Sequence, residues 1–189
     1  MTKPVTYYIS YGILGGSLKG KIMRRQLNKA GMAPVKSATE ADIIIAHSAG
    51  CWLIDPRAHP RLVFYVGLPL RAANLKMFMT ATRTINQYSV GPRHRFNHAW
   101  WGLFYGFSRA KRNLYIIRHA KTATISDFSD AQQVMIGNRY DPWLETPRMS
   151  ELMDSKPWAF VSLSGSHDNI WEEPEKYCEI IEHYAKLLV

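Results

Sequence analysis

One serine occupies a position where the sequence favours a nucleophile. Residues 43–45 are three consecutive isoleucines, and Ser48 follows at the centre of the string Ala-His-Ser-Ala-Gly at residues 46–50. A serine hydroxyl is a weak nucleophile unless a sharp strand-to-helix turn presents its oxygen to a base and to main-chain N–H groups. Small residues two positions before and two positions after Ser48 permit such a turn. Ala46 replaces the first glycine of the G-x-S-x-G pattern, and we expect its methyl group to fit.

Two later side chains have the types that activate a serine. Asp141 follows the apolar segment 131–136, and His167 follows the apolar segment 158–163. If both segments are parallel strands, their carboxyl ends lie at the edge of the sheet where ligands bind. We therefore expect Ser48, Asp141 and His167 to lie close together. Their chain order, Ser then Asp then His, is the order of the alpha/beta-hydrolase triad and differs from the other serine-triad folds.

Other residues are alternatives for the acid and the base. Asp127 and Asp130 precede the strand at 131–136, whereas Asp168 adjoins His167 and would point away from it in an extended segment. The alternative bases are the remaining histidines: His47, His59, His94, His98, His119 and His183. The sequence contains no H-E-x-x-H string, no paired C-x-x-C and no carboxylate cluster, so we predict neither a metal nor a cofactor.

Short apolar segments alternate with helical patterns along the chain. Strands are predicted at 5–10, 42–47, 61–67, 131–136 and 158–163. A helix is predicted over 19–30, a helix follows Ser48, and a C-terminal helix begins at Pro174. This alternation calls for right-handed parallel crossovers. We predict an α/β fold with an open, doubly wound, mainly parallel sheet of about five to six strands and flanking helices.

The length and charge of the chain limit its organisation. The 189 residues suffice for one domain, and the net charge is +9. Residues 56–126 hold twelve Lys or Arg and no Asp or Glu, and aromatic residues are interleaved among them. Residues 70–112 are too long for a bare loop, and we interpret them as a helical lid inserted into the single domain. The alternatives for the basic aromatic segment are a surface for membrane or nucleic acid, or a solvated face.

With these motifs in order, residues 5–188 resemble the alpha/beta-hydrolase family in a compact form. The resemblance implies that Ser48 attacks an acyl carbonyl, that His167 is the general base and that Asp141 orients the imidazole. It also implies an oxyanion hole made by the main-chain N–H groups of Ala49 and Ile13, with Leu14 as the alternative to Ile13. Tyr and Gly occupy positions 11 and 12, where families of this fold often carry His-Gly.

The implied function is a serine hydrolase that cleaves a small ester or thioester through an acyl-Ser48 intermediate. The alternatives are an acyltransferase on the same triad, or a non-catalytic binding module that uses the basic aromatic segment. The residues expected to contact substrate are Tyr11, Leu14, His47, Trp100, Trp101 and Trp143. The expected partner is a small acyl molecule, for which the basic segment favours an anionic or amphipathic character. Peripheral membrane contact stays an alternative, and a nucleic-acid partner is not expected.

The remaining expectations concern location and thiols. The N-terminus lacks the apolar core of a signal peptide, and no run approaches membrane-spanning length, so we expect a cytoplasmic protein. Cys51 and Cys178 are too few for a disulfide framework and are predicted to be buried thiols. The sequence does not indicate an oligomeric state.

Overall fold

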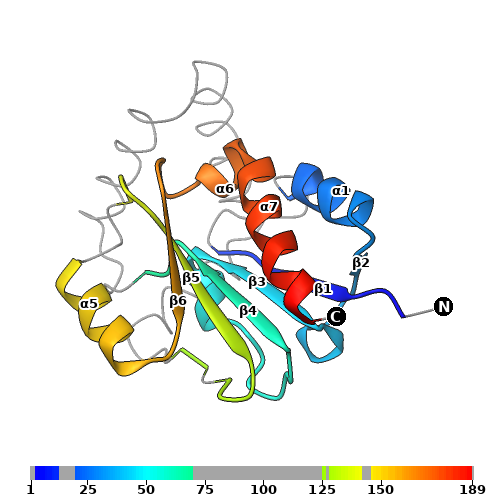
Figure 1. The fold of residues 1–189 in the computed structure, drawn as a ribbon, viewed down its shortest axis with the longest axis horizontal. Helices are drawn as coiled ribbons and strands as arrows, with labels where there is room; N and C mark the ends of the chain where they lie inside the picture. Colours follow the sequence, from blue (N-terminus) through cyan, green and yellow to red (C-terminus); the bar gives the residue numbers. More distant parts are fainter. Residues whose placement is uncertain (1–2, 13–19, 70–124, 127, 142–145, 189) are drawn as a thin grey trace, which may run out of the picture.

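A single parallel sheet organises the chain. The structure, a computed structural model, describes residues 3–12, 20–69, 125–126, 128–141 and 146–188 (Figure 1). The sheet has six strands in the order β2-β1-β3-β4-β5-β6, and every pair is parallel. The strands are β1 (Thr6–Ser10), β2 (Ala33–Pro34), β3 (Ile43–His47), β4 (Leu62–Val66), β5 (Gln132–Asn138) and β6 (Ala159–Leu163). The predicted fold class, a mainly parallel α/β sheet, is confirmed.

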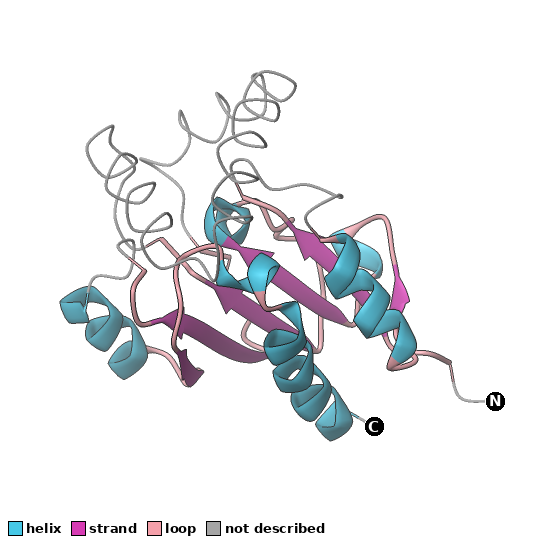
Figure 2. Cartoon of the chain, turned by 90° about the horizontal axis from the view of Figure 1, so that it is seen from above, coloured by secondary structure: helices cyan, strands magenta, loops and turns pink. Residues whose placement is uncertain are grey.

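Helices cover both faces of this sheet. Within the described residues, the α-helices are α1 (Lys21–Lys29), α5 (Thr146–Ser155), α6 (Asn169–Glu172) and α7 (Pro174–Ala185). The short 3₁₀ helices are η1 (Ala38–Glu40), η2 (Ser48–Trp52) and η3 (Lys186–Leu188). Helices α1 and α7 lie side by side on one face (Figures 1 and 2). The opposite face is covered by η1, η2 and the segment that follows it, with apolar side chains of α5 packed at its margin.

The two faces of the sheet bury alternate residues of each central strand. In β3, Ile43 and Ile45 pack toward α1 and α7, whereas Ile44 and Ala46 pack toward η1 and η2. All five residues of β3 and all five of β4 are buried. A strand buried on both faces has no polar positions to alternate with apolar ones, which explains its continuous apolar sequence. The central strands therefore hold their carboxyl ends firmly at one edge of the sheet.

Several elements differ from the sequence prediction. The helix expected after Ser48 is only the five-residue 3₁₀ helix η2. The strand β2 and the helices α5 and α6 were not predicted, because β2 has two residues, α6 has four, and α5 has a weak apolar pattern. The proposed lid at 70–112 lies outside the described residues.

Two further expectations concern the thiols and the membrane. Cys51 and Cys178 are both buried and both free of disulfide bonds, as predicted. No helix within the described ranges has the length and apolar character that crossing a membrane requires.

Candidate active site

Ser48 lies in a sharp turn between a buried strand and a helix. It directly follows β3 and is the first residue of η2, with a backbone φ of +55°. A residue with a side chain seldom adopts this left-handed conformation, and such strain is concentrated at functional sites. Ser48 is half-buried, whereas its neighbours on both sides are buried. A strained turn at the end of a strand is the backbone geometry that the sequence prediction of a nucleophile elbow requires.

The residues around Ser48 let its turn pack tightly. A Cβ atom at Gly50 would overlap the main-chain carbonyl of Ser10 on β1, so this position accepts only glycine. Ala46 is completely buried and packs in the same apolar cluster as Cys51, whose thiol donates a long hydrogen bond (3.4 Å) to the Ala46 carbonyl. The alanine that replaces the first glycine of the pattern is therefore accommodated in the core.

Gly12, the second residue after β1, lies directly against this turn. A Cβ atom at Gly12 would lie 2.7 Å from Cβ of Ser48 and 3.0 Å from the main-chain nitrogen of Ala49. The main chain of Gly12 is thus beside the nitrogen expected to form half of an oxyanion hole, which needs two convergent N–H groups. Ile13 and Leu14, the two residues expected to supply the second N–H, lie outside the described residues.

Asp141 and His167 form a buried pair. Nδ1 of His167 lies 2.7 Å from Oδ2 of Asp141, and the two side chains are 7% and 0% exposed. A carboxylate oxygen accepts this hydrogen bond, so Nδ1 of the neutral imidazole carries the proton and Nε2 does not. This tautomer is the one that a histidine needs to accept a proton through Nε2. The structure therefore brings together the two residues that the sequence assigned as acid and base.

Gly67 leaves room for this pair at the end of β4. Its backbone φ is +55°, and a Cβ atom there would lie 3.1 Å from Oδ2 of Asp141 and 3.2 Å from Cε1 and Nδ1 of His167. These distances are shorter than ordinary carbon contacts, which begin near 3.5 Å. The pair therefore lies against the backbone just after β4, a strand that lies between β3 and β6 in the sheet.

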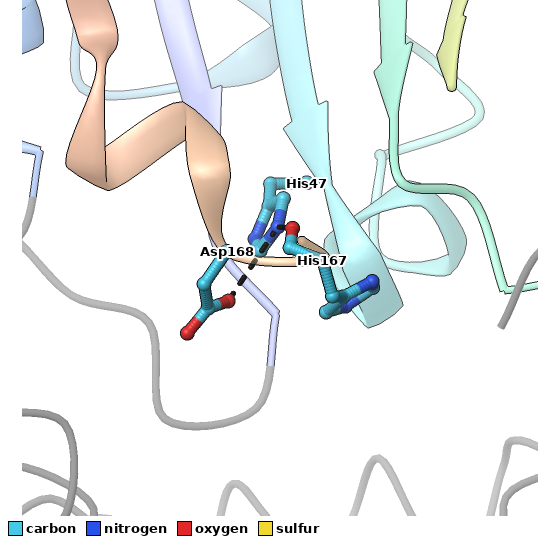
Figure 3. A group of neighbouring side chains, drawn as sticks. All are labelled: His47, His167 and Asp168. Atoms are coloured by element: carbon cyan, nitrogen blue, oxygen red, sulfur yellow. Dashed lines mark hydrogen bonds and ion pairs between the residues drawn. The ribbon is translucent and has the colours of Figure 1, made fainter. Parts of the chain in front are cut away.

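His47, the residue before Ser48, contacts the segment that carries His167. Its Nε2 lies 2.9 Å from the main-chain oxygen of His167 and 3.8 Å from Oδ1 of Asp168 (Figure 3). The rings of His47 and His167 have centroids 5.0 Å apart. The turn at Ser48 and the loop that carries His167 are thus in direct contact.

Aromatic side chains surround His47. Trp171 of α6 lies edge-on to it with ring centroids 5.1 Å apart, and the Trp171 ring stacks on Tyr11 at 5.5 Å. Arg24 donates a hydrogen bond to the Tyr11 hydroxyl. Sequence reasoning did not identify Trp171, because its contacts with His47 and Tyr11 join segments far apart in the chain. The remaining residues predicted to contact substrate, Leu14, Trp100, Trp101 and Trp143, lie outside the described residues.

A buried tyrosine supports the turn that carries Asp141. The Tyr177 hydroxyl donates a 2.6 Å hydrogen bond to Oδ1 of Asn138, and the main-chain oxygen of Asn138 accepts from the N–H of Asp141. Burial raises the pKa of the Tyr177 hydroxyl above its usual value, so the hydroxyl stays protonated and remains a donor.

Burial likewise raises the pKa of the Cys51 thiol, three residues after Ser48, which keeps this thiol in its unreactive protonated form.

His47, His167 and Asp168 are the described residues that come closest to a metal-ligand set. One ligand atom from each lies within 4.8 Å of the others. Zinc bonds of 2.0–2.1 Å hold tetrahedral ligand atoms roughly 3.4 Å apart, so the group would have to contract. In Figure 3 the His167 ring and the Asp168 carboxylate extend in different directions, and Nε2 of His47 is directed at a carbonyl oxygen. The observed geometry fits a hydrogen-bonded contact better than a metal centre.

Solved structures with the same architecture match almost the whole chain. One is the enol-lactonase from Burkholderia xenovorans LB400, with a TM-score of 0.66 and 9% identity over 98% of this chain and 92% of that chain. Another is a carboxylesterase structure from Nitrososphaera gargenis, with a TM-score of 0.62 and 14% identity over 98% of this chain and 91% of that chain. A third is the monoacylglycerol lipase of Paleococcus ferrophilus, with a TM-score of 0.60 and 12% identity over 95% and 93%.

The chain has the alpha/beta-hydrolase fold. The resemblance inferred from the sequence is thereby confirmed for the fold. No family model matches the sequence, and no curated protein matches it either. Because the identities are low, the alpha/beta-hydrolase likeness establishes the architecture alone.

Proposed function

We propose that this protein is a serine hydrolase that cleaves a small ester or thioester through an acyl-Ser48 intermediate. The observation that carries the proposal is the buried hydrogen bond of 2.7 Å between Asp141 and His167, on a loop that contacts the residue before Ser48. The left-handed backbone of Ser48 at the end of β3 supports the same assignment. A strained serine, an oriented histidine and a buried carboxylate are the three parts that activate a hydroxyl for acyl transfer.

The proposed reaction has two halves. Oγ of Ser48 attacks the acyl carbonyl while Nε2 of His167 accepts the serine proton and then delivers it to the leaving alcohol or thiol. Water then attacks the acyl-Ser48 carbonyl while His167 accepts a proton from it; the bond to Oγ breaks, His167 returns the proton to Oγ, and the acid product leaves with Ser48 restored. Asp141 orients the imidazole and stabilises its charged form. The N–H groups of Ala49 and Ile13 would stabilise the oxyanion, and one such donor contributes about 3–4 kcal/mol.

The similar structures favour hydrolysis of an acyl compound. Besides the three described above, they include the thioesterase RedJ of a prodiginine pathway and an N-formylmaleamic acid deformylase from Pseudomonas putida S16. AqDC, which cleaves the ring of the Pseudomonas quinolone signal, is also similar. Since one fold carries these different reactions, the proposal depends on Ser48, Asp141 and His167 rather than on the fold.

Ester hydrolysis by matched serine variants tests this function. The assay follows release of nitrophenol from short-chain aryl esters and of thiol from short-chain acyl thioesters. Ser48→Ala should lower kcat by about 10⁴- to 10⁶-fold, because the residual rate comes from binding and the oxyanion hole alone. Ser155→Ala is the control, since Ser155 is exposed at the end of α5. A wild-type protein inactive on every substrate, or a Ser48→Ala variant with an unchanged rate, would contradict the proposal.

A further inference from the structure

The loop that carries His167 begins far from Ser48. It follows β6, an edge strand whose residues are half-buried or exposed, whereas Ser48 follows β3. Three inter-strand spacings separate β3 from β6, about 14 Å in total. Proton transfer requires Nε2 of His167 to come within about 2.6–3.2 Å of the serine oxygen. The loop must therefore be held across the ends of β5 and β4, at the side of β3.

His47 supplies a contact at that place. Its Nε2 lies 2.9 Å from the main-chain oxygen of His167. A carbonyl oxygen can only accept, so Nε2 of His47 carries the proton and donates it. His47 is 2% exposed and His167 is 5% exposed, so water competes little for this hydrogen bond. The bond joins the residue immediately before Ser48 to the main chain of His167 itself.

The surroundings of His47 fix its ring in this orientation. The Trp171 ring packs edge-on to the His47 ring with centroids 5.1 Å apart, and the centroid of the His167 ring lies 5.0 Å away. The Asp168 carboxylate lies 3.8 Å from the same Nε2 and favours a proton on that nitrogen. Figure 3 shows the His47 ring directed at the His167 carbonyl, with a second dashed line from His47 to the Asp168 carboxylate. A rigid donor of this kind restricts where the loop can move.

We propose that His47 is a positioning residue that holds His167 beside Ser48 through the Nε2–H hydrogen bond to the His167 carbonyl. The proposal rests on the proposed hydrolase function, and it assigns His47 a role different from the substrate contact expected from the sequence. His47 takes no part in bond making or breaking. It limits the displacement of the base, for which a misplacement of 1 Å can cost about 10²-fold in rate.

Two substitutions of His47 by amide side chains that differ only in length test this positioning role. The amide nitrogen of Gln in His47→Gln can occupy the position of Nε2, whereas that of Asn in His47→Asn is one methylene shorter. Both side chains are neutral and polar, so both carry a similar cost of burial. We expect His47→Asn to lower kcat for an aryl ester by about 10- to 100-fold with KM changed by less than about twofold. His47→Gln should recover most of that loss.

The outcomes separate this inference from the hydrolase function. If the wild-type protein is active and the two folded variants have equal kcat values, the positioning role is wrong. If the wild-type protein is inactive, the hydrolase function fails instead. The contact is also measurable without substitution, by ¹⁵N NMR of the histidine-labelled wild-type protein. We expect His47 to show a protonated Nε2 that exchanges slowly with solvent, and a proton on Nδ1 alone would overturn the proposal even if His47→Asn does not fold.

Discussion

Replacing Gly67 with alanine tests whether the Asp141–His167 pair needs the space at the end of β4. The added Cβ atom would lie 3.1 Å from Oδ2 of Asp141 and 3.2 Å from Cε1 and Nδ1 of His167. Carbon contacts are most favourable at about 3.5–4.0 Å, so the pair must shift by a few tenths of an ångström. Catalytic groups tolerate displacements of about 0.5 Å before the rate falls steeply. We therefore expect Gly67→Ala to lower kcat by about three- to tenfold.

The same substitution also has a backbone cost, which a second glycine isolates. The left-handed φ of +55° at Gly67 costs a residue with a side chain about 1–2 kcal/mol. For a chain of this length that loss lowers Tm by roughly 2–8 °C. Gly31, which follows α1, has a φ of +83° and nothing within 4 Å of an added Cβ atom. Gly31→Ala therefore has a similar backbone cost without a contact to the pair.

Thermal melts and ester hydrolysis, measured on both variants, separate the two effects. Both variants should lose Tm, Gly67→Ala at least as much as Gly31→Ala because of the added contact with the pair, and only Gly67→Ala should lose kcat. If Gly67→Ala keeps the wild-type kcat, or if Gly31→Ala loses kcat to the same extent, the Asp141–His167 pair does not need this space.

Two further predictions concern stability. The Asp42 carboxylate accepts hydrogen bonds from the N–H and the hydroxyl of Thr6. Burial alone would raise the pKa of Asp42, but the two hydrogen bonds and the charge of Arg61 outweigh it, so the pKa is lower than usual. A carboxylate with a lowered pKa stabilises the fold above pH ~4, and this stabilisation is lost as pH falls through the folded-state pKa. Thr6→Val should therefore lower the free energy of unfolding by about 1–2 kcal/mol at pH 7 and by less near pH 3. Urea titrations at both pH values measure this, and an equal loss at both would contradict it. Tyr177→Phe removes the buried donor to Oδ1 of Asn138 and should cost about 1–3 kcal/mol, and an unchanged urea midpoint would contradict this.

The sequence predicts the central strands well because their burial leaves a direct signal. Residues 43–45 are isoleucines because both faces of β3 are covered, and a strand buried on both faces consists almost entirely of apolar residues. The strand β2 leaves no such signal. Its two residues, Ala33 and Pro34, pair with β1 at the edge of the sheet, so the strand is defined by its neighbour rather than by its own composition.

Some features of the candidate site were likewise predictable from the sequence, and others were not. Asp141 and His167 follow strands, and parallel strands bring their carboxyl ends to one edge, so their proximity was predictable from chain order. The contact between His47 and the His167 carbonyl was not, because a main-chain acceptor has no sequence signature. The end of η2 at Trp52 was not predictable either, because helix propensity is a weak guide to where a helix ends.

Labelling by a fluorophosphonate probe, followed by peptide mass mapping, tests the assignment of Ser48 most directly. The probe forms a covalent bond with a serine only when that serine is activated as a nucleophile. We predict a single adduct on Ser48 in the wild-type protein, no adduct in Ser48→Ala, and labelling slowed by about 10²-fold or more in His167→Ala. Folded wild-type protein that stays unlabelled, or an adduct on any other serine, would contradict the proposed nucleophile.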